Sequence, residues 1–126
     1  MKEGKVPGQF SPEVFIKNWT MLMNLGTGFI LGLYQDDELI GALGSIIIND
    51  INHGKPIANE VFWFVHPDKR GPGIRLLKAY EEEAKARGAI LCTMAHLNHL
   101  QPETLGELYR RRGYHPVETV YLKELT

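Results

Sequence analysis

The residues best suited to chemistry lie at positions 65–75, VHPDKRGPGIR, where an apolar strand pattern runs into a glycine-rich turn and the turn opens a helix pattern. The free N–H groups at a helix start point outward, and the helix dipole adds positive potential there. Glycines let a backbone approach a phosphate group closely. Three cations, Lys69, Arg70 and Arg75, surround the turn. These positions predict a phosphate site; the alternative is a surface turn with solvated charges.

Two classes of nucleotide site can be excluded at this turn. The phosphate loop of nucleoside triphosphatases requires the pattern GxxxxGK[ST], and the dinucleotide fingerprint requires GxGxxG. Neither pattern occurs in the sequence. The turn is therefore not predicted to be a nucleotide site of either class.

Histidine and cysteine give weaker signals. His96 and His99 are three residues apart in a loop pattern with no carboxylate or cysteine beside them, so solvated histidines are favoured and no metal site is predicted. Cys92 is the one cysteine of the chain, which excludes an internal disulfide and fits a reducing compartment. Its place in a short apolar strand predicts a buried, inert thiol.

The elements that must position the turn follow from hydrophobic spacing. The first helix begins with Ser11 as N-cap and Pro12 at the first helical position, and it stops at residues 24–26. Its apolar positions are Phe15, Trp19, Leu22 and Met23. Two further helices are expected at residues 73–87, with Leu76, Leu77, Tyr80 and Ala84 on one face, and at 102–112. Strands are expected at residues 29–35, 39–48, 61–65 and 90–94, followed by an extended segment at 114–122.

Two connections and one strand carry more specific expectations. The strands at 29–35 and 39–48 form a hairpin, and residues 49–59 are predicted to be a polar loop. The nearly all-apolar strand at 61–65 predicts burial on both faces. The order of elements indicates a mixed α/β or α+β fold, a sheet with helices packed on it.

The composition predicts one soluble globular domain. The chain has 126 residues, 44% hydrophobic and 23% charged, and its formal net charge of -1 gives no sequence-wide attraction to nucleic acid or membrane. It has no apolar run of transmembrane length and no secretory signal at its start. We therefore expect a cytoplasmic protein with a flexible arm at residues 1–10 and a single domain at 11–126, without nucleic-acid or membrane partners.

The glycine-rich turn resembles the coenzyme-A-binding motif of the GNAT superfamily of N-acetyltransferases, often written V-x-P-x-x-R-G-x-G-I-G. The matching residues are Val65, Pro67, Arg70, Gly71, Gly73 and Ile74. The hairpin at 34–41 and the segment at 108–114 are similar to two further family patterns, so the resemblance covers roughly residues 11–122. Arg75 stands where the family has a small residue, Pro72 removes one N–H, and the family's usual first strand is missing or confined to residues 1–10.

The resemblance implies a GNAT-like mixed, mostly antiparallel central sheet flanked by helices, and direct acetyl transfer from acetyl-CoA to an amine without a metal. The cofactor-binding residues that it implies are Trp63, Phe64, Val65, Lys69, Arg70, Gly71, Pro72, Gly73, Ile74, Arg75 and Asn98.

The resemblance also implies two catalytic residues. Tyr109 would be the general acid that protonates the leaving thiolate; the alternative is a tyrosine that only packs, beside Leu105 and Leu108. Glu60 would be the base, directly or through water; the alternative is a surface acid at a strand end. His66, His96 and His99 are alternative bases.

Two other functions stay open. One is a GNAT-fold module that binds acyl-CoA or a protein partner with little catalysis, favoured by Arg75 and Pro72; the other is an unrelated α/β scaffold. The acceptor is expected to be a small-molecule or peptide amine, selected by residues 18–28 and 49–59. The extended segment at 114–122 could pair within the sheet or across a homodimer.

Overall fold

The computed structural model describes residues 10–66, 73–95 and 102–125, with the side chains of 102–105 left aside. The described residues separate into two compact units, residues 11–94 and residue 10 together with 95–125. The expectation of a single domain at 11–126 stays a prediction. Several predictions lie outside the described residues: most of the N-terminal arm, and Lys69, Arg70, Gly71, Pro72, His96, Asn98 and His99.

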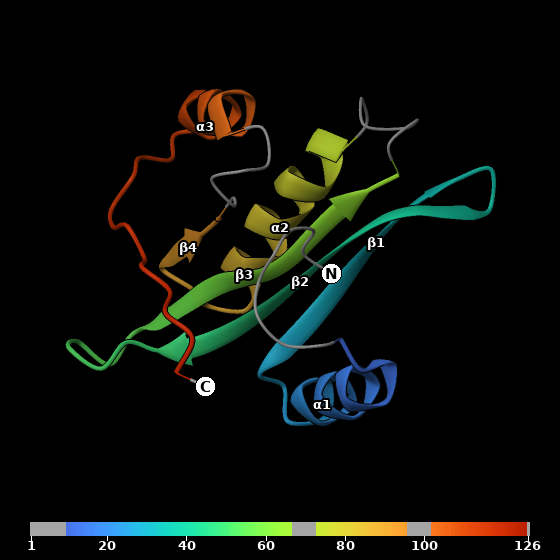
Figure 1. The fold of residues 1–126 in the computed structure, drawn as a ribbon, viewed down its shortest axis with the longest axis horizontal. Helices are drawn as coiled ribbons and strands as arrows, with labels where there is room; N and C mark the ends of the chain where they lie inside the picture. The colour runs from blue at the N-terminus through green and yellow to red at the C-terminus, as the bar shows by residue number, and fades with distance from the viewer. Residues whose placement is uncertain (1–9, 67–72, 96–101, 126) are drawn as a thin grey trace. The chain divides into compact units, whose positions relative to one another are not determined.

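The first unit is built on a four-stranded sheet in the order β1-β2-β3-β4 (Figure 1). The strands are β1 (Gly28–Gln35), β2 (Glu38–Asn49), β3 (Pro56–Val65) and β4 (Leu91–Thr93). β1, β2 and β3 pair antiparallel, and β4 joins β3 in parallel. The predicted mixed, mostly antiparallel sheet is therefore confirmed, and the predicted hairpin is formed by β1 and β2.

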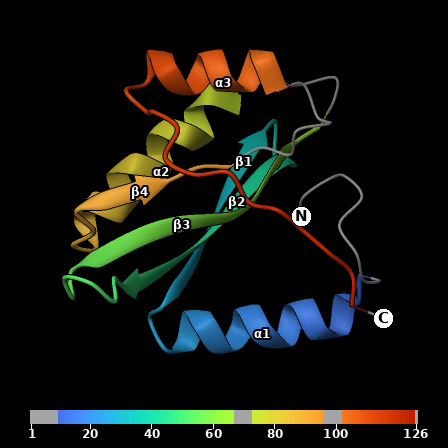
Figure 2. The same cartoon turned by 60° about the vertical axis from the view of Figure 1, so that its left-hand side comes forward.

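Helix α1 (Pro12–Asn24) packs along one face of this sheet (Figure 2). Its predicted start is confirmed, because the Ser11 Oγ accepts a hydrogen bond from the Val14 N–H at 3.4 Å. Trp19 meets Phe62 of β3 edge-on, with ring centroids 5.4 Å apart. Met23 was expected on this buried face, but it is 45% exposed.

The aromatic contact of α1 with the sheet depends on a glycine in β2. Gly44 pairs with Phe62 across the strands, and a Cβ at Gly44 would overlap the Phe62 ring. The ring therefore occupies the space beside Gly44 that a side chain would fill, and it packs there against Trp19 and Phe15.

Helix α2 (Ile74–Ala86) covers the opposite face of the sheet. Its four predicted inward residues, Leu76, Leu77, Tyr80 and Ala84, are all buried. The ring of Tyr80 lies 6.3 Å from that of Phe29 on β1. The C-cap of the helix is Arg87, whose guanidinium lies 4.7 Å from the centroid of the Phe29 ring, and Gly88 follows with a positive φ of 91°.

The structure corrects two predictions about β3. The strand begins at Pro56, so the loop predicted at 49–59 is confined to the residues before it. That turn is held by the Asp50 carboxylate, which accepts hydrogen bonds from the Asn52 and His53 N–H groups and whose pKa the Asn52 bond lowers. Burial on both faces is also wrong, because Val61 and Phe64 are 37% and 38% exposed.

The second unit contains helix α3 (Pro102–Arg111), which is followed by Gly113 with a φ of 91°. The Tyr109 ring packs 5.7 Å from the Tyr114 ring. The extended segment predicted at 114–122 forms no strand within residues 113–125, and its Val117, Val120 and Tyr121 side chains are exposed. Across the described parts of both units, no helix has the length and apolarity needed to cross a membrane.

Candidate functional site

The site begins where β3 and β4 separate. Their parallel pairing covers only Ile57–Leu91, Ala58–Cys92 and Asn59–Thr93. β3 then continues from Glu60 to Val65, past the end of β4 (Figure 1). Within the described residues, no strand pairs with this part of β3 on the β4 side. The part of a strand beyond the end of a ladder is a place where extended ligands commonly add by backbone pairing.

We call residues 60–65 of β3, beyond the ladder with β4, the β3 extension, and a β-bulge lies at its start. Gly44 pairs with Phe62 and Ser45 with Glu60, so that Val61 is the extra residue of β3. Residues two apart in a regular strand share a face, but the bulge breaks this rule. Phe62 therefore points to α1, whereas Glu60 lies on the α2 face, where its charge acts on Tyr80.

Glu60 is a buried carboxylate, only 8% exposed. The alternative interpretation, a solvated acid at a strand end, is wrong because β3 begins earlier and the bulge turns Glu60 inward. A buried carboxylate with restricted access to water is suited to accept a proton from a substrate held beside it. His66, one of the alternative bases, lies just beyond β3 and is exposed.

The start of α2 is suited to an anion. Gly73 is the N-cap and supplies no side-chain hydrogen bond to the first turn, and the first turn holds no acidic residue. The amide groups and the dipole of the helix start are therefore not neutralised from within the chain by either device. Ile74 opens the helix, and Arg75 in this first turn is exposed to solvent and adds positive charge.

Gly73 also brings the helix start against the end of β3. A Cβ at Gly73 would lie 3.0 Å from Cγ2 of Val65, which is tighter than ordinary packing. A second glycine acts one strand away, since a Cβ at Gly41 would lie 2.9 Å from the Phe64 carbonyl oxygen. Trp63 is half-buried in the same stretch of β3. The end of the β3 extension and the helix start are thus neighbours within the first unit.

Tyr109 belongs to the second unit and is 7% exposed. Its O–H donates a hydrogen bond to the Ala95 carbonyl at 3.0 Å. These contacts account for packing, and its role as a general acid stays a prediction.

Sequence reasoning missed a group of polar residues beside Glu60. Tyr80 donates to the Thr93 carbonyl at 2.9 Å, and the Thr93 Oγ1 donates to the Asn59 Oδ1 at 2.9 Å. Ser45, which is fully buried, donates to the Asn59 carbonyl at 3.0 Å. The available signal was polarity at strand and helix positions that face the core.

Metal chemistry has no visible site in the described parts of the chain. No three His, Cys, Asp or Glu side chains among those residues are grouped so as to hold a metal ion.

The side chain of Cys92 was predicted to be buried, but in the structure it is only partly buried.

Comparison with known proteins places the chain in a family. The family model of the acetyltransferase (GNAT) family matches residues 4–114. A search of curated proteins gave no match. Three similar solved structures share the fold.

A transcriptional regulator from Bacillus halodurans C-125 has a TM-score of 0.77 at 18% identity, covering 90% of this chain and 77% of that one. An aminoglycoside acetyltransferase from an uncultured soil metagenomic sample has a TM-score of 0.74 at 15% identity, covering 94% of this chain and 77% of that one. Glucosamine-6-phosphate N-acetyltransferase from Arabidopsis thaliana has a TM-score of 0.74 at 12% identity, covering 96% of this chain and 83% of that one. With a family model that spans most of its length, this chain belongs to the GNAT acetyltransferase family.

Proposed function

We propose that the protein transfers an acetyl group from acetyl-CoA to the amine of a small molecule or peptide. The observation that carries this proposal is the β3 extension, which lies beyond the ladder with β4, begins at the buried Glu60 and ends against the start of α2. One element can hold an extended chain and the other an anion. A long ligand with a phosphate group at one end and a reactive group at the other fits both.

The described residues fit coenzyme A on these grounds. The backbone of Trp63, Phe64 and Val65 would pair with the amide groups of the pantetheine arm. The first-turn amides after Gly73, with Arg75, would hold the pyrophosphate. When bound, acetyl-CoA supplies an activated thioester, and the protein has to orient it and manage protons.

Glu60 is the proposed base. An amine is protonated near neutral pH and cannot attack a carbonyl until it loses a proton. The Glu60 carboxylate, directly or through a water molecule, would accept that proton. A backbone N–H of the β3 extension would stabilise the negative oxygen that forms on the attacked carbonyl. Tyr109 is proposed as the acid that protonates the departing thiolate.

The compartment and the acceptor complete the proposal. The lone Cys92 supports a reducing compartment, and we place the protein in the cytoplasm. The similar structures suggest two acceptor classes to try, an aminoglycoside and an amino-sugar phosphate, because these occur in their names. A short peptide with a free N-terminus is the third.

The second candidate is a GNAT-fold module that binds acyl-CoA or a protein partner without appreciable catalysis. The observation that favours it is Arg75, an exposed cation at a position where the family has a small residue. A module that binds acyl-CoA would bind acetyl-CoA as the enzyme does, so turnover separates the two, whereas a module for a protein partner would show no turnover either.

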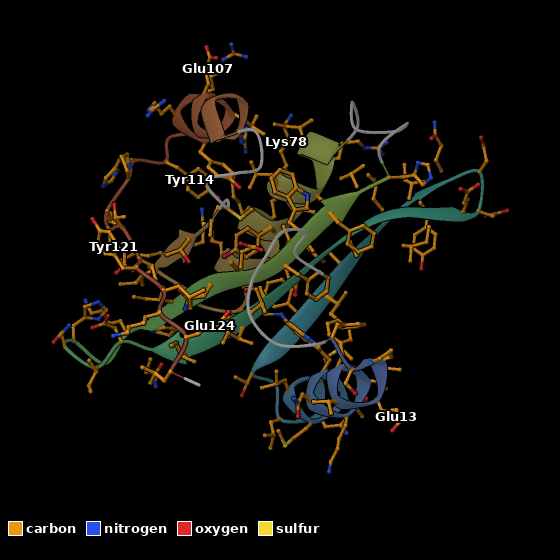
Figure 3. All side chains as sticks on the ribbon, viewed as in Figure 1. Glu13, Lys78, Glu107, Tyr114, Tyr121 and Glu124 are labelled. Atoms are coloured by element: carbon orange, nitrogen blue, oxygen red, sulfur yellow. The ribbon has the colours of Figure 1, made fainter. Side chains whose placement is uncertain are left out.

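The experiment is release of free thiol from acetyl-CoA, followed with a thiol-reactive chromophore in the presence of each amine. Wild-type protein should release thiol only when an acceptor is present. Glu60→Gln should lower kcat about 100-fold, within the range of general base catalysis, with acetyl-CoA affinity unchanged. The matched control is Glu124→Gln, an exposed acid of the C-terminal segment (Figure 3), which should behave as wild type. Binding without turnover across all three acceptor classes would favour the second candidate.

A further inference from the structure

The face of the sheet on which Glu60 lies depends on one irregularity of β3. In a regular strand, residues two apart share a face, so Glu60 would lie beside Phe62 on the α1 side. An apolar cluster that includes Trp19 covers that side, and an ionised carboxylate would be unfavourable there. The bulge at Val61 instead places Glu60 directly opposite Ser45, on the face that α2 covers. The use of Glu60 as a base therefore depends on the bulge.

The Ser45 side chain is bonded to the peptide group that leads into the bulge. Its hydroxyl is fully buried and donates to the Asn59 carbonyl oxygen at 3.0 Å, while its contact with the Ile46 carbonyl oxygen is longer, at 3.5 Å. The Asn59 carbonyl and the Glu60 N–H belong to one planar peptide group. A bond that fixes this carbonyl therefore also fixes the plane from which the Glu60 residue starts.

The side chains of Ser45, Glu60 and Tyr80 gather on the same face of the sheet. Tyr80 is fully buried, and its hydroxyl donates to the Thr93 carbonyl at 2.9 Å. Burial raises the pKa of this hydroxyl well above its usual range, charges at Cys92 and Glu60 raise it further, and a hydrogen bond with Ser45 opposes the rise. Ser45 is therefore a neighbour of both the bulged peptide and the face to which the carboxylate is turned.

The hydroxyl of Ser45 has a specific task in this arrangement. An alanine would fill nearly the same space, and a buried hydroxyl is unfavourable unless it is hydrogen-bonded. We propose that Ser45 is a positioning residue, which holds the peptide between Asn59 and Glu60 in the bulged conformation and so directs the Glu60 carboxylate to the face where it acts as the base. This inference rests on the proposed function.

Loss of the Ser45 hydroxyl should change the chemistry more than the binding of the cofactor. The ladder of β2 with β3 continues on both sides of the bulge, so the sheet should still form. The Glu60 carboxylate would then take up several orientations, of which few suit proton transfer. The proposed acetyl-CoA contacts lie farther along β3, at residues 63–65, and at the start of α2, and they should persist.

The first test is Ser45→Ala, assayed for kcat and for acetyl-CoA affinity by calorimetry. We expect kcat to fall about 2- to 10-fold, the range of one net hydrogen bond, with Kd for acetyl-CoA changed less than twofold. The matched control is Ser11→Ala, which removes the hydroxyl that accepts from the Val14 N–H at the start of α1. It should lower Tm but leave kcat as in wild type. An equal fall of kcat in both variants would show that Ser45 contributes stability alone, and it would overturn the positioning role.

The second test is Ser45→Ala in a protein that already carries Glu60→Gln. If Ser45 acts through the Glu60 carboxylate, the added substitution should change the residual kcat less than twofold. A fall by the same factor as in the wild-type background would overturn the positioning role.

The outcomes for this inference and for the proposed function are distinguishable. If turnover depends on Glu60 but Ser45→Ala has the kcat of wild type, the positioning role is overturned and the proposed function stands. If wild-type protein shows no turnover, or Glu60→Gln turns over as wild type does, the proposed role of Glu60 and this inference fail together.

Discussion

Replacing Gly73 by Asp should separate ligand binding from stability. Gly73 is the N-cap of α2, and the first turn of this helix has neither a side-chain cap nor an acidic residue. A carboxylate there interacts favourably with the helix dipole and should stabilise the folded protein by about 0.3–1 kcal/mol. The added Cβ would crowd Val65, 3.0 Å away, and offsets part of this gain. The unliganded variant should therefore unfold within about 1 kcal/mol of wild type.

The same carboxylate should oppose a phosphate held at the helix start. Two unit charges about 5 Å apart, roughly one helical turn, repel by about 1–3 kcal/mol at effective dielectric constants of about 20–80. This corresponds to a loss in acetyl-CoA affinity of roughly 5- to 150-fold. Gly73→Asn has nearly the same size without the charge, so the difference between the two variants isolates the electrostatic effect.

The assay is calorimetric titration of both variants with acetyl-CoA at low and high salt. Gly73→Asp should bind more weakly than Gly73→Asn, and the gap should narrow as salt screens the charges. Equal affinities of the two variants at low salt would show that no phosphate lies near the start of α2. The placement of the cofactor would then be wrong.

Three further predictions concern the core and the chemistry. Gly44→Ala should force the Phe62 ring away from Trp19, which should cost about 1–3 kcal/mol of stability and lower Tm by roughly 3–12 °C. The control, Gly32→Ala, adds a Cβ that meets the ends of the Tyr34 and Leu39 side chains, so it should change Tm little. Equal Tm values for the two variants would contradict this packing. Tyr109→Phe should lower kcat with acetyl-CoA affinity retained, and unchanged turnover would remove Tyr109 from the mechanism. The free energy of unfolding should fall as the pH rises above about 10, because the unfolded chain then loses the Tyr80 proton that the folded protein keeps. Tyr80→Phe should make this fall with pH less steep in alkaline denaturation. An equally steep fall in the variant would contradict the raised pKa of Tyr80.

Local signals predicted the helices and the hairpin well. Ser11 and Pro12 marked the start of α1, and the inward positions of α2 were all identified, because capping and helical spacing depend on neighbouring residues alone. The hairpin turn at Asp36 and Asp37, both with positive φ, was also visible as a polar break between two apolar runs.

The start of β3 was missed because long-range contacts decide it. In the sequence, Asn59 looks like a loop residue and Glu60 like an acid at the start of the strand. In the structure, Thr93 satisfies the Asn59 side chain, and the bulge at Val61 turns Glu60 toward α2. Neither partner is near in sequence, so propensity alone gives the wrong answer. The bulge also explains why alternation could not predict which β3 residues are buried.

The candidate site was predictable in kind but not in detail. The glycine-rich turn indicated an anion at the start of α2, and Gly73 and Val65 do lie together there. Tyr80 was identified only as an apolar-face residue, since its hydroxyl contact with Thr93 requires the sheet to be formed first.

The most direct test of the account is thermal unfolding of the purified protein with and without acetyl-CoA. A ligand that binds only the folded state at 100 times its Kd adds about 2.7 kcal/mol of stability. For a chain of this length, that should raise Tm by roughly 5–15 °C, with a smaller rise for ATP at the same concentration, since ATP lacks the pantetheine arm. No rise with acetyl-CoA, or an equal rise with ATP, would contradict the claim that the β3 extension and the start of α2 together form an acyl-CoA site.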